Sequence, residues 1–217
     1  SKKVKSNLEK AGITVKLTHD EGDIDKNHVM DEYNKGGRAV IPNEVKSKYT
    51  FSIHINKSGS SKVKGIEVYT PSDINYDLVK DIVNNITNNT SLGYSSNRLY
   101  KKFDGIYTHN FTESEVKSAI DGYDEKNYKH YNVTTNSNYL YMIRETGGFM
   151  TGAYVDSSNP DKVGVNPYYD SNIGNESYLL ELGYISNSTD VNTLKEEQDA
   201  LAKAISDSII KEINEKM

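Results

Sequence analysis

Two residues of this chain are of types that can do acid–base or metal chemistry, and both lie inside apolar stretches. His54 lies near the end of residues 51–56, and Glu181 lies within residues 177–182. Imidazole binds metals and carries protons near neutral pH, and a carboxylate among apolar residues needs a partner to offset its desolvation. For His54 alone, a hydrogen-bonded core histidine is the better interpretation. The carboxylate of Glu181, at the matching place in the second stretch, favours a functional site instead.

Both stretches are predicted to be short buried strands. Apolar and polar residues alternate along 51–56, whereas 177–182 is apolar on both faces around its single carboxylate. Ligands of open α/β sheets bind beyond the carboxyl ends of the strands. We therefore expect His54 and Glu181 to lie at the C-terminal ends of adjacent or near-adjacent parallel strands and to line one cleft.

The rest of the chain alternates between strand and helix patterns and predicts an α/β fold, with a single twisted, mainly parallel sheet flanked by helices. No internal repeat or linker divides the chain, so one domain is expected over residues 1–217. Capping boxes at Thr112 and Thr193 predict the starts of two helices. The other predicted helices cover 2–11 and 40–48 and begin at 71–73, and the other predicted strands are 13–17, 65–69 and 139–143.

Composition excludes several classes of function. The 217 residues contain no cysteine, which excludes disulfides and thiolate metal sites. The net charge of -5 argues against a nucleic-acid-binding surface, which would need a basic stripe. No apolar run approaches the length of a membrane span, so no transmembrane segment is expected.

Four segments, in the same order, resemble the zinc-dependent N-acetylmuramoyl-L-alanine amidases of the amidase-3 type. Residues 51–56 followed by 65–69 are similar to the family pattern SIHAN … GIEVYY, and residues 180–187 resemble VELGFLSN. Residues 140–144 resemble L-x-V-L-R, and residues 8–18 are similar to a helix–strand step of the family.

The resemblance implies a secreted bacterial cell-wall hydrolase, or autolysin, located outside the cell or in the wall. Its substrate would be peptidoglycan, cut at the amide bond between N-acetylmuramic acid and L-alanine. His54 would be a zinc ligand, and Glu181 would deprotonate the zinc-bound water. The other two zinc ligands of the family would precede Ser1, so the chain is expected to lack the first strand and the start of the first helix. Protein partners are not indicated.

The remaining candidates each carry an alternative interpretation. Glu67 fits a solvated or cross-strand charge better than a catalytic group, and Arg144 fits a substrate-carboxylate clamp or a structural salt bridge. His19 is the best internal substitute ligand, although a solvated loop histidine is favoured there. The same solvated interpretation is favoured for three other histidines, His28, His109 and His130.

Residues 145–176 form a long Gly-, Asn-, Asp- and Tyr-rich stretch that we expect at the mouth of the substrate site. Its tyrosines 154, 168 and 169 could stack on sugar or peptide, or simply pack. Two other functions remain open: a non-catalytic peptidoglycan-binding or assembly module on the same fold, and a zinc peptidase that acts on the stem peptide.

Overall fold

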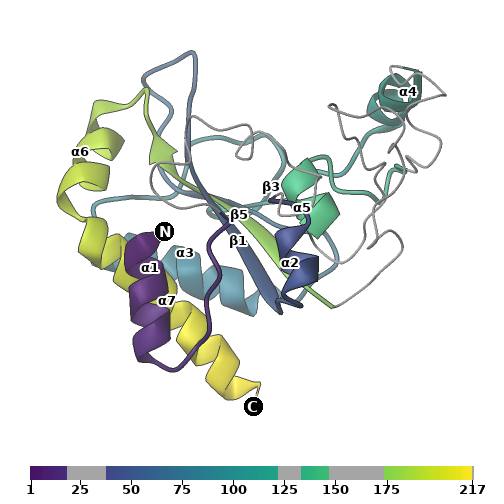
Figure 1. The fold of residues 1–217 in the computed structure, drawn as a ribbon. Helices are drawn as coiled ribbons and strands as arrows, with labels where there is room; N and C mark the ends of the chain where they lie inside the picture. Colours follow the sequence, from purple (N-terminus) through teal and green to yellow (C-terminus); the bar gives the residue numbers. More distant parts are fainter. Residues whose placement is uncertain (19–37, 122–132, 147–173, 217) are drawn as a thin grey trace, which may run out of the picture. The chain divides into compact units, whose positions relative to one another are not determined.

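The computed structural model describes residues 1–18, 38–121, 133–146 and 174–216 (Figure 1). These residues form two compact units. The first contains residues 1–17, 52–108 and 179–217, and the second contains residues 18–51 and 109–178. Both His54 and Glu181 belong to the first unit, which is therefore the one that concerns the candidate chemistry.

One open sheet of five strands has the order β1-β5-β2-β4-β3. Strand β5 runs antiparallel to β2, β4 runs parallel to β2, and β3 runs antiparallel to β4. The N–H groups of Glu176 and Ile185 donate to the carbonyls of Lys48 and Asn56, both at 2.8 Å, so β1 and β5 run parallel. The strand bounds are β1 Tyr49–Asn56, β2 Glu67–Tyr69, β3 Lys101–Phe103, β4 Ile106–Tyr107 and β5 Glu176–Tyr184.

The α/β fold is confirmed, but the sheet is mixed rather than mainly parallel. Only two residues, Asp104 and Gly105, connect β3 to β4, and a connection this short can join only antiparallel strands. The predicted strand at 13–17 has no regular secondary structure.

Three helices of the first unit, α1 (Lys2–Lys10), α3 (Asp77–Asn89) and α7 (Gln198–Glu215), lie side by side (Figure 1). Each of the three helices buries apolar residues. The buried stripe residues are Leu8 on α1, Leu78, Ile82, Val83 and Ile86 on α3, and Leu201, Ile205 and Ile209 on α7. Helix α3 begins at Asp77, four residues or more after the predicted start.

The predicted capping box at Thr193 is wrong. Helix α6 covers Ser188–Glu196, so Thr193 lies in its interior. The cap is Asn187, whose side-chain oxygen accepts the N–H groups of Thr189 and Asp190. An asparagine cap six residues earlier satisfies free amide groups at the true start of the helix, so Thr193 has no terminus to cap.

The second unit contains α2 (Ile41–Glu44), α4 (Glu113–Asp121) and α5 (Tyr141–Thr146). Helix α2 is shorter than predicted, with Pro42 in its first turn. The predicted strand at 139–143 is wrong, because α5 occupies most of it. The side chain of Asn138 accepts the N–H of Leu140 at 2.9 Å just before this helix, and this contact favours a helix start over a strand. Within the described residues, no helix is both long and apolar enough to cross a membrane.

Candidate active site

Two carboxyl groups face each other across the antiparallel strands β2 and β5. Glu67 pairs directly with Glu181 in this register, so both side chains lie on one face of the sheet. Glu67 has no solvent-exposed surface. The expectation of a solvated charge at Glu67 is therefore wrong, and the cross-strand interpretation is confirmed.

Four donors surround the buried carboxylate of Glu67. Its Oε2 atom accepts from Asn56 Nδ2 at 3.1 Å and from the phenol of Tyr69 at 2.9 Å. Its Oε1 atom accepts from Ser95 Oγ at 2.7 Å and from the phenol of Tyr184. Burial is the main cause that raises the pKa values of both tyrosines, so both phenols stay protonated as donors. This network ties the ends of β1 and β5 and the loop at Ser95 to the middle of the sheet.

Glu181 is placed differently. Its Oε2 atom is buried and has no hydrogen-bond partner among the described residues. Burial, and then the charge of Glu67, raises the pKa of Glu181 to about 7. A carboxyl group with this pKa exchanges its proton readily near neutral pH, which suits a general base or acid.

His54 lies on the same face as the two carboxyl groups. The side chain of Asn56 reaches Glu67, and residues two apart on a strand point the same way, so His54 shares that face. Its Nε2 atom shares a hydrogen bond of 2.8 Å with Ser52 Oγ. The prediction that this strand is buried is wrong: β1 is one of the two edge strands of the described sheet, and His54 is exposed.

A pocket of about 320 Å³ opens beside Glu67. Three of its lining residues, Asn56, Tyr69 and Tyr184, are donors to that carboxylate. The pocket and the buried charge therefore form one site. The remaining lining residues are Lys57, Ser58, Val63 and Asn97.

Asp190, at the start of α6, holds the two strands that carry the carboxyl groups. Its Oδ2 atom accepts the N–H groups of Gly65 and Tyr184, each at 2.8 Å. Gly183 has φ +85°, and a Cβ there would lie 3.0 Å from Asp190 Oδ2. At Gly65, with φ +98°, a Cβ would lie 2.6 Å from Gly93 O. These close approaches explain why the two strand motifs contain glycine.

A catalytic zinc takes three protein ligands and leaves one position open. The imidazole of His54 and the unpartnered carboxylate oxygen of Glu181 are of suitable chemistry and share a face. However, within the described ranges no three His, Asp or Glu side chains come together as a metal site. The donor set that these residues offer is incomplete.

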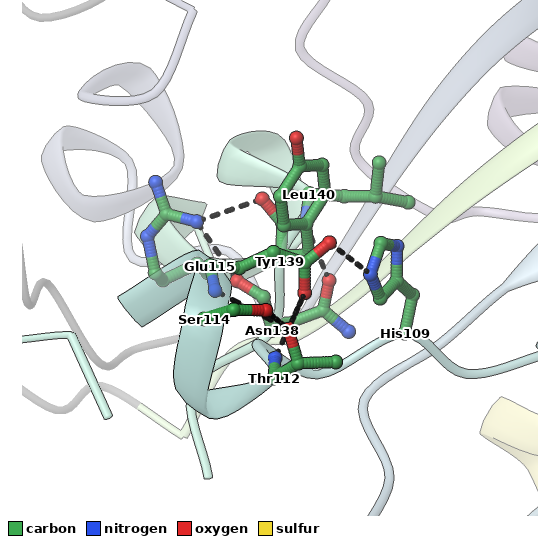
Figure 2. A network of polar contacts seen from close by, with 8 residues as sticks. His109, Thr112, Ser114, Glu115, Asn138, Tyr139 and Leu140 are labelled. Atoms are coloured by element: carbon green, nitrogen blue, oxygen red, sulfur yellow. Dashed lines mark hydrogen bonds and ion pairs between the residues drawn. The ribbon is translucent and has the colours of Figure 1, made fainter. Parts of the chain in front are cut away.

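A second polar cluster lies in the second unit and surrounds His109 (Figure 2). His109 is buried, its ring stacks on Tyr139 at 4.3 Å between centroids, and its Nε2 atom lies 3.4 Å from Glu115 Oε1. The expectation of a solvated loop histidine is wrong here. The predicted capping box is confirmed: Thr112 N–H donates to Glu115 Oε2 at 2.8 Å, and Glu115 N–H donates to Thr112 Oγ1 at 3.2 Å. Capping explains this cluster without any catalytic role.

Arg144 is also part of the second unit's core. It is buried, donates from Nη1 to the carbonyls of Asn138 and Tyr139, and lies over the ring of Phe111. These contacts anchor the start of α5. The other predicted candidates lie outside the described residues: His19, His28, His130, most of residues 145–176, and the three tyrosines of that stretch.

Residues 1–211 match the amidase-3 family, described as N-acetylmuramoyl-L-alanine amidase. The match covers nearly the whole chain, so this protein belongs to that family. No curated protein matches it.

Three solved structures share the fold. The chain is 18% identical to Cwp6 from Clostridium difficile, with a TM-score of 0.54 over 97% of this chain and 23% of that one. It is 18% identical to the CwlD amidase of Clostridioides difficile, solved with the GerS lipoprotein, with a TM-score of 0.55 over 98% and 81% of the two chains. It is 22% identical to the amidase AmiC2 of Nostoc punctiforme, with a TM-score of 0.57 over 98% of this chain and 79% of that one. The chain thus spans less than a quarter of Cwp6 and about four fifths of the other two.

Proposed function

We propose that this protein is a peptidoglycan hydrolase that cuts the amide bond between N-acetylmuramic acid and L-alanine, with residues 1–217 as one catalytic domain. Membership of the amidase-3 family supports this reaction. The observation that carries the proposal is the cross-strand pair, in which Glu67 is fully satisfied and Glu181 keeps a buried oxygen without a partner. An amide hydrolase needs such a group to accept a proton from water.

In this proposal, Glu181 carries the proton in both halves of the reaction. Its carboxylate takes a proton from the attacking water as the water oxygen bonds to the carbonyl carbon of the lactyl group. Glu181 then delivers that proton to the nitrogen of L-alanine as the C–N bond breaks. Its raised pKa suits both steps, because the group can hold and release a proton at the same pH.

Zinc is the proposed cofactor, with His54 as one of its protein ligands. When bound, zinc supplies a more acidic water and polarises the scissile carbonyl. His54 fits this role because it is exposed and lies on the face of Glu181. We propose that the protein works outside the cell, in the wall where its substrate lies.

A non-catalytic peptidoglycan-binding module is the second candidate. The incomplete set of metal donors among the described residues favours it. A module of this kind would bind peptidoglycan, hold no stoichiometric zinc and release no product.

Product analysis separates these functions. We expect digestion of purified peptidoglycan to release stem peptides with a new amino group on L-alanine and to leave a free lactyl carboxyl on muramic acid. Cuts within the stem peptide would instead show a zinc peptidase. Metal analysis of the purified protein tests for bound zinc, and the absence of both zinc and product would favour the binding module.

A further inference from the structure

Seven consecutive residues, 98–104, are all exposed, in the loop that enters β3 and along β3 itself. They include three cations and one anion, although the whole chain has a net charge of -5. Three large apolar side chains are exposed among them: Leu99 at 62%, Tyr100 at 36% and Phe103 at 40%. Cations and large apolar groups on one short segment are typical of a binding surface.

Several contacts fix the backbone of segment 98–104. Thr108 N–H donates to the carbonyl of Tyr100 at 3.0 Å, and Leu99 N–H donates to Asn97 Oδ1 at 3.0 Å. Tyr100 has φ 61°, a left-handed conformation that residues other than glycine rarely adopt. The rings of Phe103 and Tyr76 form a T-shaped contact, with 5.3 Å between their centroids. The segment therefore presents its side chains from a defined backbone.

The segment continues directly from the candidate active site. Ser95 donates to Glu67, and Asn97 lines the pocket beside that carboxylate. The phenol of Tyr107 donates to the carbonyl of Asn97 at 2.9 Å and holds this connection in place. Residues 98–104 therefore follow the pocket-lining Asn97 directly in the chain.

Charge identifies the part of the polymer that would bind here. Lys101 pairs with Asp104 at 2.6 Å, whereas in the described part of the chain neither Arg98 nor Lys102 forms an ion pair. Free guanidinium and ammonium groups bind carboxylates. Exposed tyrosine and leucine side chains offer flat, apolar contact area to sugar rings or peptide.

We propose that segment 98–104 binds the carboxylate-bearing stem peptides of peptidoglycan beside the active site, with Arg98 and Lys102 as the cations. This inference rests on the proposed function for the identity of the polymer. The segment would hold a stretch of the polymer next to the bond that is cut, so it contributes to binding and takes no part in proton transfer.

Sedimentation with purified peptidoglycan tests this surface in the Glu181→Gln background, in which the polymer stays intact. We expect the double substitution Arg98→Ala with Lys102→Ala to weaken binding roughly fivefold at low salt, since each exposed ion pair contributes little on its own. Leu99→Ser should weaken it further. The matched control removes two lysines from helix surfaces, Lys10→Ala with Lys203→Ala, and should leave binding unchanged. Equal binding by the two double variants would overturn the proposal.

Two further experiments identify the ligand of segment 98–104. Amidation of the stem-peptide carboxylates should reduce binding by the parent protein to the level of the Arg98/Lys102 variant, and unchanged binding would exclude those carboxylates. Vesicles of equal phosphatidylglycerol and phosphatidylcholine test a membrane instead. If the Arg98/Lys102 variant loses only vesicle binding, the surface binds lipid and the proposal is wrong.

If the wild-type protein shows no amidase activity but the peptidoglycan result holds, the proposed function fails and this inference stands.

Discussion

Glu67 and Glu181 face each other across β2 and β5, and within the described residues only one of the two carboxyl groups has its hydrogen bonds satisfied. Four donors surround Glu67 and stabilise its charge. That buried charge, in turn, disfavours ionisation of Glu181. The two glutamates therefore have different roles: Glu67 stabilises the structure of the site, and Glu181 is available for proton transfer.

Removal of the proton acceptor should abolish catalysis. Glu181→Gln keeps the size of the side chain but cannot accept a proton, so we expect the rate of amide hydrolysis to fall by about a hundredfold or more. Circular dichroism and metal analysis should match the parent protein. A Gln variant with near-normal turnover on a soluble muropeptide would exclude Glu181 as the base.

The same residue should give the folding stability a specific pH dependence. Its pKa is about 7 in the folded state and 4.5 ordinarily, so between these values the folded protein holds the extra proton. The contribution of protonated Glu181 to the free energy of unfolding is therefore fully present below about pH 4.5 and is lost as the pH rises through 7.

Urea unfolding of metal-free protein at pH 5, 6, 7 and 8 can measure this effect. The free energy of unfolding of the parent, minus that of Glu181→Gln, should fall across this range, because other titrating groups are common to both proteins. A difference that stays flat or rises with pH would contradict the assignment.

Glu67 should be needed for stability more than any single donor around it. In Glu67→Gln, one side-chain oxygen becomes an NH2 group that cannot accept, so the two donors to that oxygen lose their acceptor. We expect a loss of about 1–3 kcal/mol in the free energy of unfolding. Ser95→Ala removes one donor and leaves three, so it should cost less. If both variants unfold at the same urea concentration as the parent, the network does not stabilise the fold.

Gly65, the glycine just before strand β2, should tolerate no side chain. Gly65→Ala would bring a Cβ within 2.6 Å of Gly93 O and Tyr94 O at a positive φ, so we expect a loss of about 2 kcal/mol or more. Gly59 is the matched control, because a Cβ there meets nothing within 4 Å. Thermal melts should separate the two alanine variants, and equal melting temperatures would show that the backbone relaxes around Gly65.

The sequence could predict the strands of His54 and Glu181, because alternation and apolar runs are local signals. The role of Glu67 could not be predicted. Alternation along 65–69 does not show whether both faces are covered, and three of its four donors, Asn56, Ser95 and Tyr184, come from distant parts of the chain. The signal that was present is the pair of phenols in the two motifs, at Tyr69 and Tyr184, each of which would need a partner when buried.

Helix α5 shows the opposite failure, in which a local signal was misleading. Residues 139–143 are aromatic and branched enough to suit a strand, and the side chain of Asn138 starts a helix instead. The long stretch 145–176 lies mostly outside the described residues, and its place at the substrate mouth stays a prediction.

The position of Asp190 in the chain has a consequence for the order in which the site can form during synthesis. This carboxylate holds Gly65 and Tyr184, which lie 125 and 6 residues before it. Until residues 176–190 have been synthesised, strand β2 therefore has neither the strand that faces Glu67 nor the carboxylate that accepts the N–H of Gly65. The nascent chain should keep this region open until residue 190 has emerged, and a chaperone could bind the exposed β2 until then.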